Sequence, residues 1–273
     1  MSEVNGGYDM KALWTNDIHL EFLDNRGRRL FLRKLAGSDA ECVLIAGDIG
    51  QAPSLVAYLE EIEAVLQRPI YFALGNHDYY RGSIAETRAS IRDLVKRSRW
   101  LRWVSDLPAI QLTAGTALVG HDGWGDGRLG DYHSSMVELS DFLYIKEVTG
   151  LSKSERLQRI GALGDEAAQH LTEVLPEALA SDHVVVLTHV PPWAEAAWYE
   201  GGHSGPEWLP FFSCKAVGEV LKAAMQEHPD IRMTVLCGHT HGGGVSQILP
   251  NLVVYTGAAR YGHPVAQGVF DWG

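Results

Sequence analysis

Cysteine is scarce in this sequence, because its 273 residues include only three. Three thiols are too few for the disulfide framework that stabilises small secreted domains. Cys42 and Cys237 stand within apolar runs typical of buried strands, so we expect both to be free, buried thiols. Cysteine usage therefore excludes a disulfide-rich fold and favours the cytoplasm as the compartment.

Long apolar runs are absent as well. No stretch approaches the roughly 18 consecutive apolar residues that a membrane-spanning helix requires. The N-terminal stretch MSEVNGGYDMK contains neither a basic cluster nor an apolar core, and so it does not resemble a secretory signal. We expect residues 1–9 to form a disordered leader, and we expect no membrane span.

Positive charge is also in short supply, with 23 Lys and Arg against 34 Asp and Glu and a formal net charge of −11. Proteins that bind long nucleic acids neutralise successive phosphates with a basic face. We therefore do not expect a long nucleic acid as the partner. A small phosphorylated substrate is compatible with this charge, because bound metal ions can dominate the local charge of a site.

Apolar residues make up 46% of the chain, and their pattern alternates between strands and helices. Strands are expected at residues 11–15, 42–46 and 70–74, each followed by a helix, at 26–35, 53–67 and 83–99. This alternation predicts a parallel sheet with right-handed crossovers. Later strands are expected at 101–104, 109–112, 117–119, 183–187, 231–237, 252–256 and 269–272. Helices are expected at 136–145, 155–179 and 214–227, and Ser213 is expected to cap the N-terminus of the helix at 214–227. Residues 193–210 are expected to form a loop.

Potential metal ligands follow the expected strands at the point where each strand ends. The carboxyl ends of parallel strands meet at one edge of a sheet, where α/β proteins bind ligands. Any one group has an ordinary explanation in turn chemistry, since Gly, Asn and Asp all favour turns. Their recurrence predicts a shared metal site, and the groups are Asp17 with His19, Asp48, Asn76 with His77 and Asp78, His121 with Asp122, His189, and His239 with His241.

Five short motifs, DIH, GD, GNHD, THVPP and GHTH, occur in this order between Asp17 and His241. They resemble the five signature blocks of calcineurin-like metallophosphoesterases. The resemblance implies an α/β fold, a four-layer α-β-β-α sandwich in which two mixed β-sheets are flanked by helices. We expect a single metallophosphoesterase domain over residues 1–273, with a helical cap or insertion within about 130–180.

The resemblance also implies a dinuclear metal centre. Carried over by position, Asp48 and a water or hydroxide bridge the two ions. The remaining ligands are Asp17, His19 and His241 for one metal, and Asn76, His189 and His239 for the other. Oxygen and imidazole ligands without thiolate suit manganese, iron or zinc, and the sequence does not choose among these metals.

The implied reaction is hydrolysis of a phosphoester. Two ions about 3.5–4 Å apart hold both a nucleophile and a phosphoryl oxygen for in-line attack. In such sites His77 is not a ligand but faces the leaving group as a general acid, with Asp78 orienting its ring. We expect a metal-dependent phosphoesterase, and the leading hypothesis is a phosphodiesterase or pyrophosphohydrolase acting on a small substrate.

Substrate contacts are expected from residues that follow the ligand-bearing strand ends. The candidates are His121, Tyr80, Arg81, Trp193 and Arg260. Arginine binds a second phosphate or a carboxylate in bidentate fashion, and a tryptophan ring can stack on a planar group. The oligomeric state is not predicted.

Three alternatives stay open on the sequence. One is a phosphomonoesterase or protein phosphatase, which uses the same metal centre. Another is a non-catalytic, metal-dependent scaffold, although every expected ligand and His77 are present. The third is a metallo-β-lactamase-like hydrolase, for which His239 and His241 give the required H-x-H, but no Asp-His follows and an Asn ligand has no place.

Overall fold

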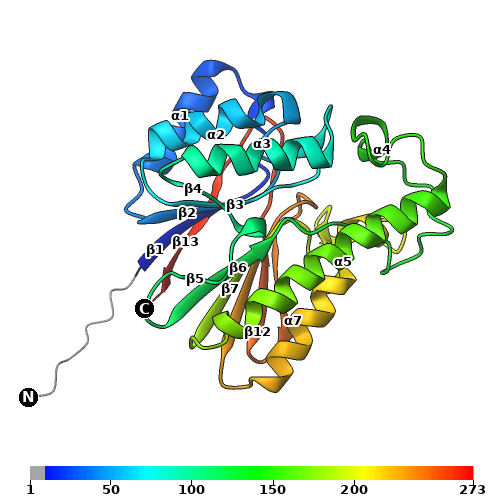
Figure 1. Cartoon of the computed structure of the whole chain (residues 1–273). Coiled ribbons are helices and arrows are strands. Elements are labelled where there is room, and N and C mark those ends of the chain that lie inside the picture. Colours follow the sequence, from blue (N-terminus) through cyan, green and yellow to red (C-terminus); the bar gives the residue numbers. More distant parts are fainter. Residues whose placement is uncertain (1–9, 273) are drawn as a thin grey trace, which may run out of the picture.

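Two β-sheets face each other at the centre of the molecule, and helices cover both outer faces (Figure 1). The computed structural model describes residues 10–272, so the prediction for residues 1–9 lies outside the described part. One sheet has five strands in the order β13-β1-β2-β3-β4, and the other has six in the order β11-β12-β10-β7-β6-β5. The predicted four-layer sandwich is confirmed.

The five-stranded sheet is built mainly from the N-terminal part of the chain. Its parallel strands are β1 (Met10–Thr15), β2 (Cys42–Ala46), β3 (Ile70–Ala73) and β4 (Leu101–Trp103), and β13 (Ala266–Trp272) pairs with β1 in the antiparallel direction. All residues of β2 are buried, as is typical of a parallel strand covered on both faces. The connecting helices are α1 (Asn25–Ala36), α2 (Ala52–Leu66) and α3 (Ile84–Arg97).

The six-stranded sheet has a parallel centre and two antiparallel edges. The parallel strands are β6 (Thr116–His121), β7 (His183–Thr188), β10 (Arg232–Cys237) and β12 (Leu252–Thr256), and the edges are β5 (Ile110–Gln111) and β11 (Gly244–Leu249). Its outer face carries α5 (Lys153–Ala178) and α7 (Lys215–Glu227). Four short 3₁₀ helices complete the structure, η1 (Leu20–Phe22), η2 (His77–Tyr79), η3 (Val104–Asp106) and η4 (Ala194–Ala196).

A continuous apolar core joins the two sheets. Side chains of β1 and β2, including Trp14 and Leu44, pack with Leu118, Val185 and Leu236 from the second sheet. Burial of these side chains favours the association of the sheets, at about 25 cal/mol per Å² of apolar area removed from water. Because the sheets are fixed against each other, the carboxyl ends of β1, β2, β3, β7 and β10 meet at one edge of the sandwich.

Two segments that follow strand ends differ from the expectation. Residues 136–145 were predicted to be helical, but only α4 (Asp141–Tyr144) is. The chain just before this segment is held against the segment at 206–207, because the Asp131 amide donates to Pro206 O and Ser135 Oγ donates to Glu207 O. The expected loop at 193–210 contains a hairpin and leads into a short helix, namely β8 (Trp198–Tyr199), β9 (Gly202–His203) and α6 (Leu209–Phe212).

Three smaller predictions also have clear outcomes. Ser213 does not cap α7, because its hydroxyl donates to Leu209 O and the N-cap residue is Cys214. All three cysteines are free and buried, which confirms the prediction for Cys42 and Cys237. None of the helices between residues 10 and 272 has the length and apolar character needed to cross a membrane.

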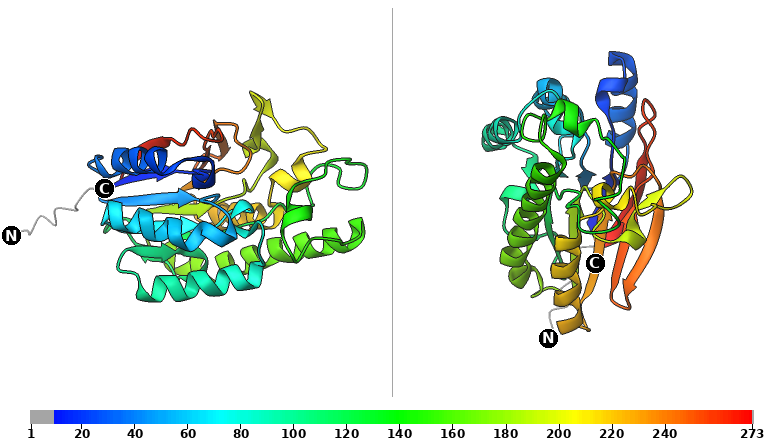
Figure 2. Two further views of the ribbon diagram at one scale, coloured as in Figure 1. Left: turned by 90° about the horizontal axis from the view of Figure 1, so that it is seen from above. Right: turned by 90° about the vertical axis from the view of Figure 1, so that its right-hand side faces the viewer.

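The end of the sandwich where the ligand-bearing strands terminate is covered by chain segments around α4 and around the β8–β9 hairpin. Figure 2 shows both segments at the end of the molecule opposite the C-terminus. Helix α5, which falls within the range predicted to hold a helical cap or insertion, packs along α7 and β6 on the outer face of the second sheet. The part of 130–180 that lies over the strand ends is therefore the stretch before α5.

Candidate metal centre

The backbone adopts strained conformations where β1, β2 and β10 end. Among the described residues, eight other than glycine have positive φ angles, and five of these eight are predicted ligands. The left-handed conformation costs roughly 1–2 kcal/mol for a residue with a Cβ atom, and such residues cluster at functional sites. The five are Asp17 (46°), His19 (40°), Asp48 (52°), His239 (71°) and His241 (60°).

One half of the candidate centre brings Asp17, His19 and His241 together beside Asp48. One ligand atom from each of these four residues lies within 4.8 Å of the others. His19 Nε2 is 3.1 Å from His241 Nε2 and 3.6 Å from Asp48 Oδ2. His241 Nε2 is in turn 3.5 Å from Asp17 Oδ1. Two imidazoles and two carboxylates thus enclose a space with the donor set that a divalent transition metal prefers.

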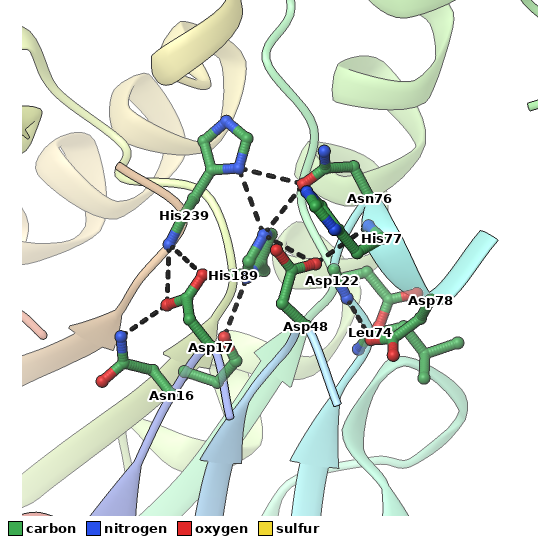
Figure 3. Close-up of polar contacts among 12 residues, drawn as sticks. Asn16, Asp17, Asp48, Leu74, Asn76, His77, Asp78, Asp122, His189 and His239 are labelled. Atoms are coloured by element: carbon green, nitrogen blue, oxygen red, sulfur yellow. Dashed lines mark hydrogen bonds and ion pairs between the residues drawn. The ribbon is translucent and has the colours of Figure 1, made fainter. Parts of the chain in front are cut away.

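The other half brings together Asn76, His189 and His239 (Figure 3). Asn76 Oδ1 is 3.1 Å from His189 Nε2 and 3.0 Å from His239 Nδ1, and these two nitrogens are 3.2 Å apart. His189 Nε2 is also 3.4 Å from Asp48 Oδ1. The two oxygens of Asp48 therefore face different halves, Oδ2 toward His19 and Oδ1 toward His189.

Backbone carbonyls fix the tautomers of two histidines in the second half. His189 Nδ1 is 2.9 Å from Ala46 O, and His239 Nε2 is 3.0 Å from Phe211 O. A carbonyl oxygen only accepts hydrogen bonds, so each of these nitrogens carries the ring proton. Burial lowers the pKa of His239 to about 3 and also lowers the pKa of His189, so both rings are neutral.

The opposite ring nitrogens, His189 Nε2 and His239 Nδ1, consequently present lone pairs. They face each other and Asn76 Oδ1 with no hydrogen atom between them. Such an arrangement repels itself unless a cation lies at its centre, and metal-binding histidines commonly donate their other N–H to a carbonyl in this way. The residues present therefore fit a metal ion.

The buried carboxylates of the centre also indicate that a metal ion binds there. Burial raises the pKa of Asp48 well above its usual value, and the negative charges of Asp17 and Asp78 raise it further. Burial also acts to raise the pKa of Asp17, but the hydrogen bond with His241 is the main effect in the opposite direction, and this pKa is lowered. An ionised Asp48 in this position requires nearby positive charge, which a metal ion supplies.

A glycine is required between β3 and Asn76 because Asp48 and His189 pack directly against the backbone there. A Cβ atom on Gly75 would overlap Asp48 Oδ1 and lie 2.7 Å from His189 Cε1. Real Cβ atoms do not approach other atoms so closely, so a side chain here would displace Asp48 or His189. The first residue of the GNHD motif thus has a steric function.

Asp141 was missed by the sequence interpretation, and it orients Asn76. Its Oδ1 accepts hydrogen bonds from Asn76 Nδ2 at 2.8 Å and from Tyr80 Oη at 2.7 Å. Because the amide nitrogen is held by Asp141, the amide oxygen points toward His189 and His239. No local pattern marks Asp141, since it is a single carboxylate in a segment that was expected to be an ordinary helix.

His77 lies beside the centre without joining either half. Its ring stacks on Tyr80 with centroids 4.1 Å apart, and it lies 4.6 Å from the His19 ring. Its backbone N–H donates to Asp48 Oδ1 at 2.9 Å. Burial lowers the pKa of His77 to about 2.

Asp78 does not contact the His77 ring in the way the sequence interpretation expected. Its carboxylate instead accepts three backbone hydrogen bonds, at 2.8 to 2.9 Å, from Ile49, Gly50 and Gly75. These bonds join the loop after β2 to the loop after β3. Asp78 thereby fixes the loop that carries Asp48 relative to the loop that carries Asn76.

A cavity of about 350 Å³ opens onto the centre. Asp48, His239 and His241 contribute to its floor. Its walls are Asn76, His77, Tyr80, Leu139, Ser140, Asp141, Tyr199, Trp208, Phe212, Thr240 and Tyr261. Of the five residues predicted to contact substrate, Tyr80 lines this cavity. Four aromatic residues that the sequence interpretation did not single out for substrate contact line it as well: Tyr199, Trp208, Phe212 and Tyr261.

The other four predicted substrate residues lie elsewhere. His121 is a buried residue of β6, and its Nδ1 accepts from the Gly123 amide at 3.1 Å. Arg81 lines a separate depression with Ala52, and Trp193 packs against α7 at Gly218. Arg260 is exposed and does not line the cavity, whereas its neighbour Tyr261 does.

The sequence of residues 10–243 matches the family model described as calcineurin-like phosphoesterase. This range contains every residue of the candidate centre. No curated protein matches the chain significantly.

Three solved structures are similar in fold. The phosphopantetheinyl hydrolase PptH from Mycobacterium tuberculosis has a TM-score of 0.66 and 12% identity, with 93% of this chain and 90% of that chain covered. A dimetal phosphatase from Danio rerio has a TM-score of 0.60 and 15% identity, covering 95% and 91%. The protein TT1561 of Thermus thermophilus has a TM-score of 0.53 and 14% identity, covering 92% and 90%. At these identities the likeness establishes the fold alone.

Proposed function

The chain belongs to the calcineurin-like phosphoesterase family and is a metal-dependent phosphoester hydrolase, and on this basis we propose that it hydrolyses a small phosphodiester or pyrophosphate. We further propose that residues 1–273 form a single domain. The observation that carries the assignment of the centre is the placement of Asp48, whose two oxygens face two separate sets of potential metal ligands.

We assign Asp17, His19 and His241 to one metal ion and Asn76, His189 and His239 to the other, with Asp48 shared. When bound, two such ions supply Lewis acidity at a phosphoryl oxygen and a nucleophile at neutral pH. The chain's own contribution is to hold the donors in place. Ala46 O, Phe211 O and Asp141 orient donors of the second half, and the Asp78 carboxylate fixes the loops that carry Asp48 and Asn76.

His77 is the proposed general acid. It lines the cavity beside the centre, and stacking on Tyr80 restricts the rotation of its ring. Because burial lowers its pKa to about 2, the ring is neutral in the free site. Proton donation to a leaving group therefore requires that an anionic substrate in the cavity restores the proton on His77.

The cavity supports a substrate of modest size. Its volume of about 350 Å³ lies at the lower end of the range for small-molecule sites. Among the described residues that line it, none is a lysine or arginine, so a long polyanion finds no basic track there. No observation specifically favours a protein phosphatase or a metallo-β-lactamase-like hydrolase.

The test is a comparison of three substrates with the manganese-loaded protein. We expect hydrolysis of bis-p-nitrophenyl phosphate and of 2′,3′-cyclic AMP at higher kcat/KM than hydrolysis of p-nitrophenyl phosphate. A preference for the monoester would favour a phosphomonoesterase. Absence of turnover on all three, with two metals bound, would support a non-catalytic scaffold and contradict the proposal.

A further inference from the structure

The charges around the cavity restrict what the substrate carries beyond its reacting phosphate. The lining contains no lysine or arginine, and outside the candidate centre its charged group is Asp141. The two arginines suggested by the sequence do not line the cavity, since Arg81 lines another depression and Arg260 is exposed outside it. A second phosphate would therefore meet a carboxylate and aromatic rings, without a cationic side chain to neutralise it.

One wall of the cavity is an aromatic cluster next to the second half of the centre. Trp208 stacks on Phe212 with centroids 5.1 Å apart and an interplanar angle of 26°, and Tyr199 lies 5.3 Å from each of them. Phe212 lies 5.3 Å from the ring of His239. This cluster offers apolar ring surface directly beside the atoms that would hold the phosphoryl group.

A second, more exposed aromatic residue of the lining, Tyr261, lies beside the first half of the centre. Tyr261 lies 4.6 Å from the His19 ring, 4.8 Å from the His241 ring and 6.0 Å from the His77 ring. Phe22 packs on Tyr261 at 4.7 Å, and the two side chains are 52% and 46% exposed. Large apolar side chains with this much exposure beside a reaction centre are typical of a binding surface.

We infer that the substrate is a phosphodiester with an uncharged group on each side of the phosphate, and that it is not a pyrophosphate. This inference rests on the proposed function. The retained ester group, which carries a ring, lies against Tyr199, Trp208 and Phe212. The leaving group lies against Tyr261, because this wall adjoins His77, the proposed proton donor to the leaving oxygen.

The experiment compares substrates that differ in one group, using the manganese-loaded full chain. Phenyl p-nitrophenyl phosphate and methyl p-nitrophenyl phosphate share a leaving group and differ in the retained ester. P1,P2-diphenyl diphosphate keeps the phenyl groups and adds a second phosphate. We expect kcat/KM to be about tenfold higher for the phenyl ester than for the methyl ester, as ring stacking typically contributes. We expect the diphosphate to be hydrolysed at least about tenfold less efficiently than the phenyl ester, since a second anion is left without a cation.

Two substitutions test the assignment of the walls. Trp208→Ala should lower kcat/KM on the phenyl ester about tenfold and change it less than about twofold on the methyl ester. Trp208→Phe, which keeps a ring, should retain most of the preference. Tyr261→Ala should lower kcat/KM on both esters by the same factor, because both have the same leaving group. Trp100→Ala, on a tryptophan that stacks with Arg99 remote from the cavity, is the matched control and should leave both rates unchanged.

The outcomes separate the inference from the proposed function. Turnover of the esters with equal kcat/KM for phenyl and methyl, or a preference for the diphosphate, would overturn the inference and leave phosphoester hydrolysis standing. Loss confined to the phenyl ester in Tyr261→Ala would show that the walls are exchanged, and this also overturns it. Failure to hydrolyse any of the three substrates, or p-nitrophenyl phosphate, would overturn the proposed function itself.

Discussion

Asp141 should control the affinity of one metal ion and not of the other. The carboxylate holds the Asn76 amide at 2.8 Å and the Tyr80 hydroxyl at 2.7 Å. Replacing Asp141 with Ala removes both acceptors. Each orphaned donor costs about 1–3 kcal/mol when buried, and the Asn76 amide becomes free to turn its oxygen away from His189 and His239.

The expected magnitude follows from the position of Asp141 behind a ligand. Loss of a residue that orients a ligand typically weakens metal binding by about 10–100-fold. Calorimetric titration of the metal-free Asp141→Ala protein with Mn²⁺ should therefore show one dissociation constant raised by this factor and the other changed less than about threefold. Asp141→Asn is the matched control, because its amide oxygen still accepts from both donors.

Two results would refute this reasoning. If Asp141→Ala leaves both dissociation constants unchanged, the orientation of Asn76 does not depend on Asp141. If both constants rise by the same factor, the two halves of the centre are not held separately. A loss of folding is distinguished from these cases by the unfolding transition of the metal-free variant.

Three further predictions follow from the same contacts. His77→Ala should keep both metals and lose about 10²–10⁴-fold in rate on alkyl leaving groups but less on p-nitrophenolate; equal losses would argue against proton donation by His77. Gly75→Ala should lower the free energy of unfolding by about 1–3 kcal/mol and weaken metal binding, because the added Cβ atom would overlap Asp48 and His189. Gly202→Ala is the neutral control, because the space around Gly202 is open. Equal losses of stability in the two variants would contradict the steric argument. Burial lowers the pKa of His121 to about 4, below the value of about 6.5 in the unfolded chain. The unfolded state therefore binds more protons, and the free energy of unfolding falls by up to about 3 kcal/mol as the pH drops from about 6.5 to 4. In denaturant unfolding, His121→Gln should show a flatter pH dependence of this free energy, and an unchanged slope would refute the role of His121.

The strands and the residues at their ends are predictable from the sequence because both depend on local patterns. β2 is an uninterrupted apolar run, and Asp48 follows it after a single glycine. Parallel strands align their carboxyl ends within each sheet, and packing of the two sheets then brings together residues as distant as Asp17 and His241. The assignment of ligands to the two halves that we propose is what the resemblance of the five motifs to the family's signature blocks implies.

The walls of the cavity are not predictable in the same way. Tyr199 lies on a two-residue strand, and Trp208 and Tyr261 lie outside the long helices and strands, so the course of these segments depends on contacts with other parts of the chain. Arg81 and Arg260 follow or adjoin such segments too, yet their side chains do not line the cavity. Proximity in sequence to a ligand therefore says little about the direction of a side chain on a loop.

Charged side chains also acquire roles that depend on their partners. Asp78 stands next to His77 in sequence, but its carboxylate is saturated by three backbone N–H groups from two loops. Asp141 lies 65 positions from Asn76 and makes the hydrogen bond that orients it. Such contacts are a property of the folded chain, and no spacing rule encodes them.

The central claim is that Asp48 is shared by two metal ions, because its oxygens face His19 on one side and His189 on the other. The most direct measurement is metal analysis of the purified Asp48→Ala protein after loading and desalting, beside the wild type and Asp39→Ala, a substitution of an exposed carboxylate. We predict two ions per chain in the wild type and in Asp39→Ala, and loss of both from Asp48→Ala. Full occupancy of both sites in Asp48→Ala would contradict the shared centre.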